Sequence, residues 1–146
     1  MPISPSKSKV CFFFQAVSTS LKNRTALKKF ILTIFRKEGK QPGTINYIFC
    51  TDKAILDINR QFLQHDFYTD IITFDLSEGG SALSDIYISV DRVKENALKL
   101  GISNKEELHR VIFHGILHLC GYGDKNKRDK EEMRLKEDFY LSLYFK

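Results

Sequence analysis

Between residues 108 and 120 the sequence is apolar on almost every side of a predicted helix. The apolar positions are Leu108, Val111, Ile112, Phe113, Ile116, Leu117, Leu119 and Cys120. Ser103, followed by Glu106 three residues later, is typical of a capping box that begins such a helix. Gly121 stands where a left-handed C-terminal cap is expected. A helix without a polar face must be covered on most sides, so the rest of the chain is expected to pack around it.

The flanking segments predict a small sheet and further helices. Strands are expected at Val10–Val17, Thr44–Cys50, Ile71–Leu76 and Asp85–Val90. Helices are expected at Asn23–Glu38, from Thr51 or Asp52 with an inward face of Ile55, Ile58 and Phe62, near Arg92–Leu100, and at Lys127–Leu143. Strands early in the chain and helices late favour an α+β fold, a small mixed four-stranded sheet packed with about five helices.

The length of 146 residues predicts a single domain, 1–146, with residues 1–9 as a loose lead-in. No apolar run approaches the ~20 residues needed to cross a bilayer. The short apolar segment Val10–Val17 is not followed by a signal-peptide cleavage pattern, so a cytoplasmic protein without a membrane partner is expected. Cys11, Cys50 and Cys120 never form a C-x-x-C pair, which argues against a disulfide framework and a cysteine-rich zinc site.

Two histidines lie inside the apolar helix. His114 and His118 are four residues apart, so both imidazoles stand on one helix face. Gly121 and Gly123 let the chain turn back and bring Asp124 toward the same point. Two imidazole nitrogens and a carboxylate, with a fourth position open, are typical of a catalytic zinc site. The pattern predicts a zincin-like metal-site helix with one zinc ion per chain; the alternative is a pair of hydrogen-bonded core histidines.

Residue 115 is glycine, so the helix lacks the H-E-x-x-H motif, in which a glutamate serves as general base for peptide hydrolysis. The sequence also has no glycine-rich phosphate loop and no serine or cysteine nucleophile elbow.

The segment His114-Gly-Ile-Leu-His118-Leu-Cys-Gly-Tyr-Gly-Asp124 resembles the signature of the YbeY family. Further similarity lies at Ile58-Asn59, Phe62, Asp66, Thr69–Phe74 and Asp85–Ile88. The resemblance implies a metal-dependent endoribonuclease that acts on single-stranded RNA in ribosomal RNA processing, including maturation of the 3′ end of 16S ribosomal RNA, and in ribosome quality control. Its implied partners are ribosomal RNA or ribosomal subunits, and its ion would polarise a phosphoryl oxygen, activate water, or both.

The chain departs from the family pattern in three places. The family usually has a third histidine at the position of Asp124, and aspartate is also a sound zinc ligand. A family arginine that would stabilise phosphate charge falls on Leu63. Arg60, one helical turn earlier, is the first candidate to replace it, and Arg110, one turn before His114, is the second. The third departure is Tyr68 in place of proline, a change that a loop should tolerate.

Two other functions remain open at this point. One is a zinc peptidase or amidase of related fold, against which Gly115 argues. The other is a ribosome-associated factor that does not catalyse, which Leu63 keeps open because it removes a charge from the site.

Positive charge is concentrated in the first 40 residues, which hold nine basic side chains and one acid, for a net charge of +8. The other 106 residues hold 14 basic and 17 acidic side chains, for a net charge of −3. A local positive field attracts polyanions, so the basic side of Asn23–Glu38 is expected to contact the RNA backbone.

Replacing Lys22, Lys28 and Lys29 with glutamine should flatten the dependence of RNA affinity on salt. Each lost phosphate contact removes roughly 0.7 from the log–log slope, so the slope should change by up to about 2 units. Affinity measured across a salt series tests this, with zinc content as the control. An unchanged slope would assign the basic segment to solubility or to a protein partner.

Overall fold

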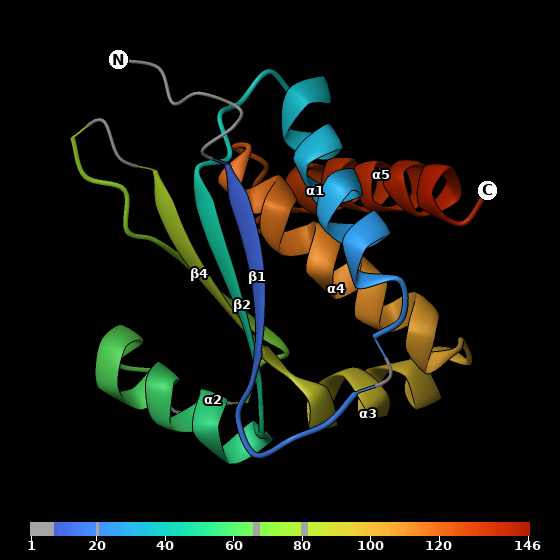
Figure 1. Ribbon diagram of the computed structural model, residues 1–146. Helices are drawn as coiled ribbons and strands as arrows, with labels where there is room; N and C mark the ends of the chain where they lie inside the picture. The colour runs from blue at the N-terminus through green and yellow to red at the C-terminus, as the bar shows by residue number, and fades with distance from the viewer. Residues whose placement is uncertain (1–7, 20, 66–67, 80–81) are drawn as a thin grey trace.

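The computed structural model describes residues 8–19, 21–65, 68–79 and 82–146 (Figure 1). These residues form β1 (Lys9–Phe14), α1 (Arg24–Lys37), β2 (Thr44–Cys50), α2 (Asp52–Ile58), the π-helical turn η2 (Asn59–Leu63), β3 (Ile71–Asp75), β4 (Leu83–Ser89), α3 (Val90–Leu100), α4 (Asn104–Leu119) and α5 (Lys127–Tyr144). The expected α+β class and the expected order of strands and helices are confirmed, with η2 as an addition.

The four strands form one mixed sheet in the order β1-β2-β4-β3. β1, β2 and β4 are parallel, and β3 runs antiparallel to β4 at one edge. One face packs against α1 and α4, α5 packs on α4, and α2 covers part of the other face (Figure 1). The second face carries a small separate cluster in which Ile55 of α2 meets Cys50 and Ile72.

Helix α4 lies at the centre of the main core, as its apolar sequence predicts. Ile112, Phe113 and Ile116 are fully buried, and the Tyr47 hydroxyl on β2 donates a hydrogen bond to the Ile112 carbonyl at 2.9 Å. Gly115 faces the sheet, where a Cβ would stand 3.0 Å from the Ile71 Cδ1 atom. The missing side chain therefore lets α4 approach β3 closely.

Local capping chemistry sets several helix ends as expected. The Thr51 hydroxyl accepts a hydrogen bond from the Ala54 N–H at 3.1 Å, and the Ser103 hydroxyl accepts one from the Glu106 N–H at 3.0 Å. Gly101 ends α3 with a φ of 69°, in the left-handed region that glycine adopts without strain.

Two expectations at element ends are wrong. β1 ends at Phe14 rather than Val17, because Ala16 takes a φ of 54° and leaves the extended conformation. Phe62 is not on a buried helix face but is 62% exposed, since α2 changes to the π-helical turn η2 and the apolar spacing no longer follows an α-helix.

Of the expected lead-in at 1–9, residues 1–7 lie outside the described residues, and Lys9 already pairs with Thr44 in the sheet. Among the helices of the described residues, none is both long and apolar enough to span a membrane.

Candidate metal centre

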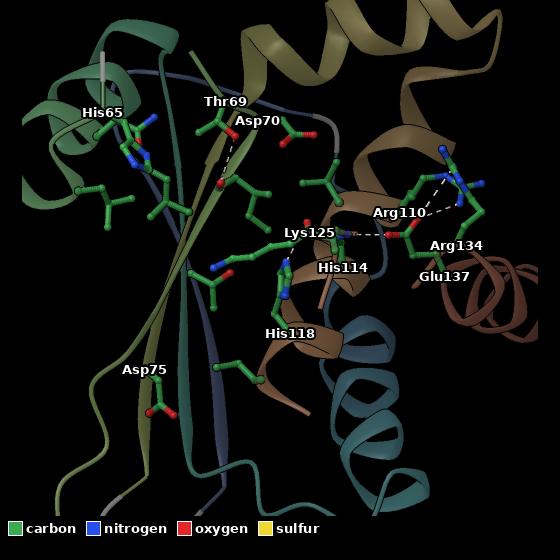
Figure 2. A pocket seen from close by; sticks show the side chains of 18 of the residues that line it. His65, Thr69, Asp70, Asp75, Arg110, His114, His118, Lys125, Arg134 and Glu137 are labelled. Carbon is green, nitrogen blue, oxygen red and sulfur yellow. Dashed lines mark hydrogen bonds and ion pairs between the residues drawn. The ribbon is translucent and has the colours of Figure 1, made fainter. Parts of the chain in front are cut away.

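A cleft of about 870 Å³ opens between α4 and the edge strand β3 (Figure 2). The turn η2 contributes Asn59 and Leu63 to its wall, and the loop after α4 contributes Asp124 and Lys125. The histidine face of α4 points into this cleft. The close approach of α4 to the sheet at Gly115 thus places the two imidazoles beside the sheet edge.

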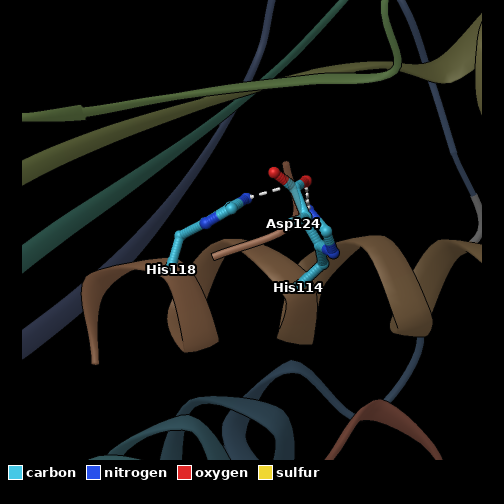
Figure 3. A group of neighbouring side chains, drawn as sticks. All are labelled: His114, His118 and Asp124. Atoms are coloured by element: carbon cyan, nitrogen blue, oxygen red, sulfur yellow. Dashed lines mark hydrogen bonds and ion pairs between the residues drawn. The ribbon is translucent and has the colours of Figure 1, made fainter. Parts of the chain in front are cut away.

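His114, His118 and Asp124 meet in the cleft, each offering one atom that could bind a metal, and these atoms all lie within 4.8 Å of one another (Figure 3). The Nε2 atoms of His114 and His118 each stand 3.2 Å from the Asp124 Oδ2 atom. Gly121, with a φ of 105°, ends α4 and lets the chain reverse toward the histidines. The structure therefore brings together the three residues that the sequence pattern selected.

The other nitrogen of each ring is already engaged. His118 Nδ1 lies 2.9 Å from the Tyr122 carbonyl oxygen, which can only accept, so Nδ1 carries the proton. His114 Nδ1 lies 2.6 Å from Glu137 Oε2 and donates to that carboxylate in the same way. With the proton on Nδ1, the Nε2 atom of a neutral ring presents its lone pair to the Asp124 carboxylate. Three acceptors facing one another need a cation or a proton between them, and the set fits a divalent metal ion.

A proton competes with a metal ion for His114. Burial acts to lower the pKa of His114, but its hydrogen bond to Glu137 and the negative charges of Glu137, Asp124 and Asp70 outweigh burial, and the pKa is raised. The carboxylates stabilise the protonated form of His114, and a metal ion must displace that proton from the ring. Acidification therefore opposes metal binding.

Glu137 is a buried carboxylate on α5 that joins the site to Arg110. Its Oε1 atom lies 3.1 Å from Arg110 Nη1, and the same nitrogen lies 2.8 Å from Asp138 Oδ1. The Arg134 guanidinium is further away, at 3.9 Å from Glu137. With Glu107 Oε1 3.8 Å from Arg110 Nε, three carboxylates compensate Arg110, although this candidate for phosphate binding lines the cleft.

A second acidic side chain, Glu38, contacts the loop that bears Asp124 through the Tyr122 hydroxyl. The Tyr122 hydroxyl donates to Glu38 Oε1 at 2.7 Å, the Tyr140 hydroxyl donates to Glu38 Oε2, and the Lys136 ammonium lies 3.2 Å from Oε2. Burial acts to raise the pKa of Glu38, but these three donors outweigh burial and lower the pKa. Glu38 stays ionised and fixes Tyr122, whose carbonyl orients His118.

Arg60 is exposed on η2 and is not among the residues that line the cleft, whereas Leu63 is. Asp66 lies outside the described residues. Sequence reasoning did not assign a role to six charged residues that line the cleft: Asp70, Asp75, Glu107, Lys125, Arg134 and Glu137. Burial raises the pKa of the Asp70 carboxyl. The position of Lys125 near the site could have been predicted from the sequence, because Lys125 directly follows the candidate ligand Asp124.

Lys125 is a cation of the cleft, whose lining also includes several acidic side chains. The Lys125 side chain extends from the loop toward β3 (Figure 2), and no described residue provides it with an acidic partner. A flexible ammonium group in a cleft beside three candidate metal ligands is suited to an anionic substrate.

The family model described as endoribonuclease YbeY matches residues 14–144 of the chain. An endoribonuclease YbeY from Cytophaga hutchinsonii is 50% identical over 139 residues, which cover 94% of this chain and 97% of that protein. One from Porphyromonas gingivalis is 46% identical over 136 residues, covering 93% of this chain and 90% of that protein. The solution structure of a Thermotoga maritima protein superimposes with a TM-score of 0.61 at 28% identity, covering 94% of this chain and 89% of that one.

Glu137→Gln should lower the affinity for zinc about 10- to 100-fold, because it keeps the side-chain size but removes the negative charge that orients His114. Asp138→Asn is the matched control, since Asp138 neighbours Glu137 and also binds Arg110 but does not touch His114. Competition with a zinc-sensing dye measures both affinities. An equal loss in the two variants would make the effect one of general charge rather than of histidine orientation.

Proposed function

The chain belongs to the endoribonuclease YbeY family, and from this membership we propose that it cleaves single-stranded RNA with one zinc ion held by His114, His118 and Asp124. The family is known for maturation of the 3′ end of 16S ribosomal RNA, and the chain is a metal-dependent hydrolase of this kind. We further propose that it acts in the cytoplasm, as one domain spanning residues 1–146, on ribosomal RNA or ribosomal subunits.

One observation carries the metal proposal: both Nδ1 atoms are committed to acceptors, so both Nε2 atoms turn lone pairs toward a carboxylate. Two imidazole nitrogens and one oxygen suit zinc and leave a position for substrate or water. When bound, the ion supplies Lewis-acid chemistry, polarising a phosphoryl oxygen and activating water for attack.

The chain's own residues position the reactants. Glu137 and the Tyr122 carbonyl keep His114 and His118 in the orientation that binds a cation. Lys125 offers positive charge within the cleft, where the phosphate of an RNA strand would lie. Arg60 is proposed to add charge from η2, because it precedes Leu63, which lines the cleft, by three residues.

Position 115 argues against peptide hydrolysis. A Cβ at Gly115 would already stand 3.0 Å from Ile71 and 3.2 Å from Ile86, so the glutamate that zinc peptidases carry there has no space. The intact cluster of three ligating side chains also argues against a factor that has lost catalysis.

The basic segment is proposed to hold the RNA beyond the cleft. Lys22 and Lys29 are exposed, and the Lys28 ammonium lies 5.5 Å from the centre of the Phe12 ring. Helix α1 packs against β1 and α4, whereas the cleft opens between α4 and β3. Contact with α1 therefore requires a strand longer than the part held in the cleft.

His114→Ala, His118→Ala and Asp124→Ala should each lose most of the bound zinc, from about one equivalent per chain, and lose RNA cleavage with it. Asp124→His, which supplies a third imidazole, should keep both. Zinc analysis and cleavage of a short unpaired RNA measure the two effects, with circular dichroism to verify folding. Full zinc content in a folded alanine variant would remove that residue from the site.

Arg60→Lys should lose most of the cleavage rate while RNA affinity changes little, because lysine cannot form the bidentate contact of a guanidinium with phosphate oxygens. Single-turnover rates and binding isotherms separate the two quantities. If Arg60→Ala cleaves at the wild-type rate, Arg60 has no such role, and Lys125 is the next residue to test.

A further inference from the structure

Phe62 is the most exposed aromatic side chain in the described part of the chain, at 62%. It lies on the π-helical turn η2, where the helix begun at Asp52 changes its hydrogen-bonding pattern before Gln64 takes a φ of 56°. An α-helical continuation predicts Phe62 on the buried face, and the turn instead exposes it. π-Helical turns are rare in proteins, and those that occur are often found at functional sites. The exposed ring on this turn is therefore a candidate for ligand binding.

The Phe62 ring is exposed but not loose. It meets Phe74 of β3 edge-on, with ring centres 6.1 Å apart and planes at 76°. Phe74 in turn meets Tyr87 of β4 at 6.0 Å and 86°, and both belong to the small cluster under α2. The sheet therefore holds the ring in place through two aromatic contacts, while most of its surface faces solvent. A fixed aromatic ring with an open surface is suited to stack on a flat partner.

This ring is continuous with the proposed catalytic cleft. Asn59 and Leu63, on the same turn as Phe62, line the cleft. Thr73 and Asp75 of β3 also line it, and Phe74, which lies between them in sequence, points to the other face. In the described part of the chain, the edge strand β3 and the turn η2 lie between the cleft and Phe62. A chain that leaves the cleft across this edge meets the Phe62 ring next.

The charge nearby favours a nucleic acid strand as that chain. Arg60 lies two residues before Phe62 and is exposed on the same turn. Lys125 lies across the cleft on the side of the metal-binding atoms. Proteins hold single strands with exposed rings that stack on bases and with cations that meet phosphates, and this edge of the molecule offers both kinds of side chain.

We propose that Phe62 is a stacking site for an unpaired base of the RNA strand, located just outside the cleft on the η2 side. The proposal rests on the proposed function and deepens it. Bases in a duplex are already stacked and paired, so this site accepts only single-stranded RNA. Phe62 thereby contributes to substrate selection and binds substrate without taking part in bond cleavage.

Phe62→Leu should weaken binding of a short unpaired RNA on the order of 5- to 100-fold, and Phe62→Trp should keep the affinity. Fluorescence anisotropy with the full-length chain and a metal chelator measures binding without cleavage. A series of RNAs with one 2-aminopurine each should show quenched fluorescence at one position with wild type and no quenching there with Phe62→Leu. Zinc content and the melting temperature should stay at wild-type values.

Phe13→Leu is the matched control, because Phe13 is 50% exposed on β1, the opposite edge strand of the same sheet. Its RNA affinity should equal that of wild type. Equal losses in Phe13→Leu and Phe62→Leu, or wild-type affinity in Phe62→Leu, would overturn the proposal. Wild-type RNA affinity combined with lost binding of Phe62→Leu to purified small ribosomal subunits would instead assign Phe62 to a protein contact.

The proposed function can fail separately. A wild-type chain that binds RNA but does not cleave it with zinc would contradict the nuclease mechanism, and the stacking result would still stand on the binding data.

Discussion

The molecule depends on a close packing of α4 against the sheet, made possible by Gly115. Most of α4 is buried, yet one of its faces must stay open for two histidines. Because Gly115 has no side chain, the helix can approach Ile71 and Ile86 closely and bury this part of its surface while the histidine face stays open. At this edge β3 turns antiparallel to the rest of the sheet, and the space beside it becomes the cleft. The close packing of α4 at Gly115 therefore determines both how the core is packed and where the cleft lies.

Two acids outside α4, the buried Glu137 and the partly buried Glu38, hold the groups that orient the two imidazoles. Glu137 holds His114 and is compensated by Arg110, while Glu38 holds Tyr122, whose carbonyl holds His118. Removing charges from water is costly, and each carboxylate is accordingly surrounded by donors. These contacts tie α1, α4, α5 and the loop after α4 together. The orientation of the two imidazoles thus depends on tertiary contacts as well as on the motif.

What the sequence could predict is the part that depends on neighbours along the chain. The Thr51 and Ser103 caps, the glycine ends of α3 and α4, and the turn that returns Asp124 are all local. The roles of Glu137 and Glu38 could not be predicted, because their contacts join residues 23 and 84 positions apart. The exposure of Phe62 could not be predicted for another reason: apolar spacing assumes 3.6 residues per turn, and η2 departs from that period.

We propose that two imidazoles and a carboxylate coordinate zinc, and X-ray absorption spectroscopy of the zinc-loaded chain can identify the ligands of the ion. Cys120 lies two residues after His118, but burial raises the pKa of its thiol to about 12, so it is a poor ligand. We predict a first shell of nitrogen and oxygen at about 2.0–2.2 Å with the outer-shell scattering of two imidazole rings. A sulfur shell at about 2.3 Å, or a shell without imidazole scattering, would show that His114, His118 and Asp124 are not the zinc ligands.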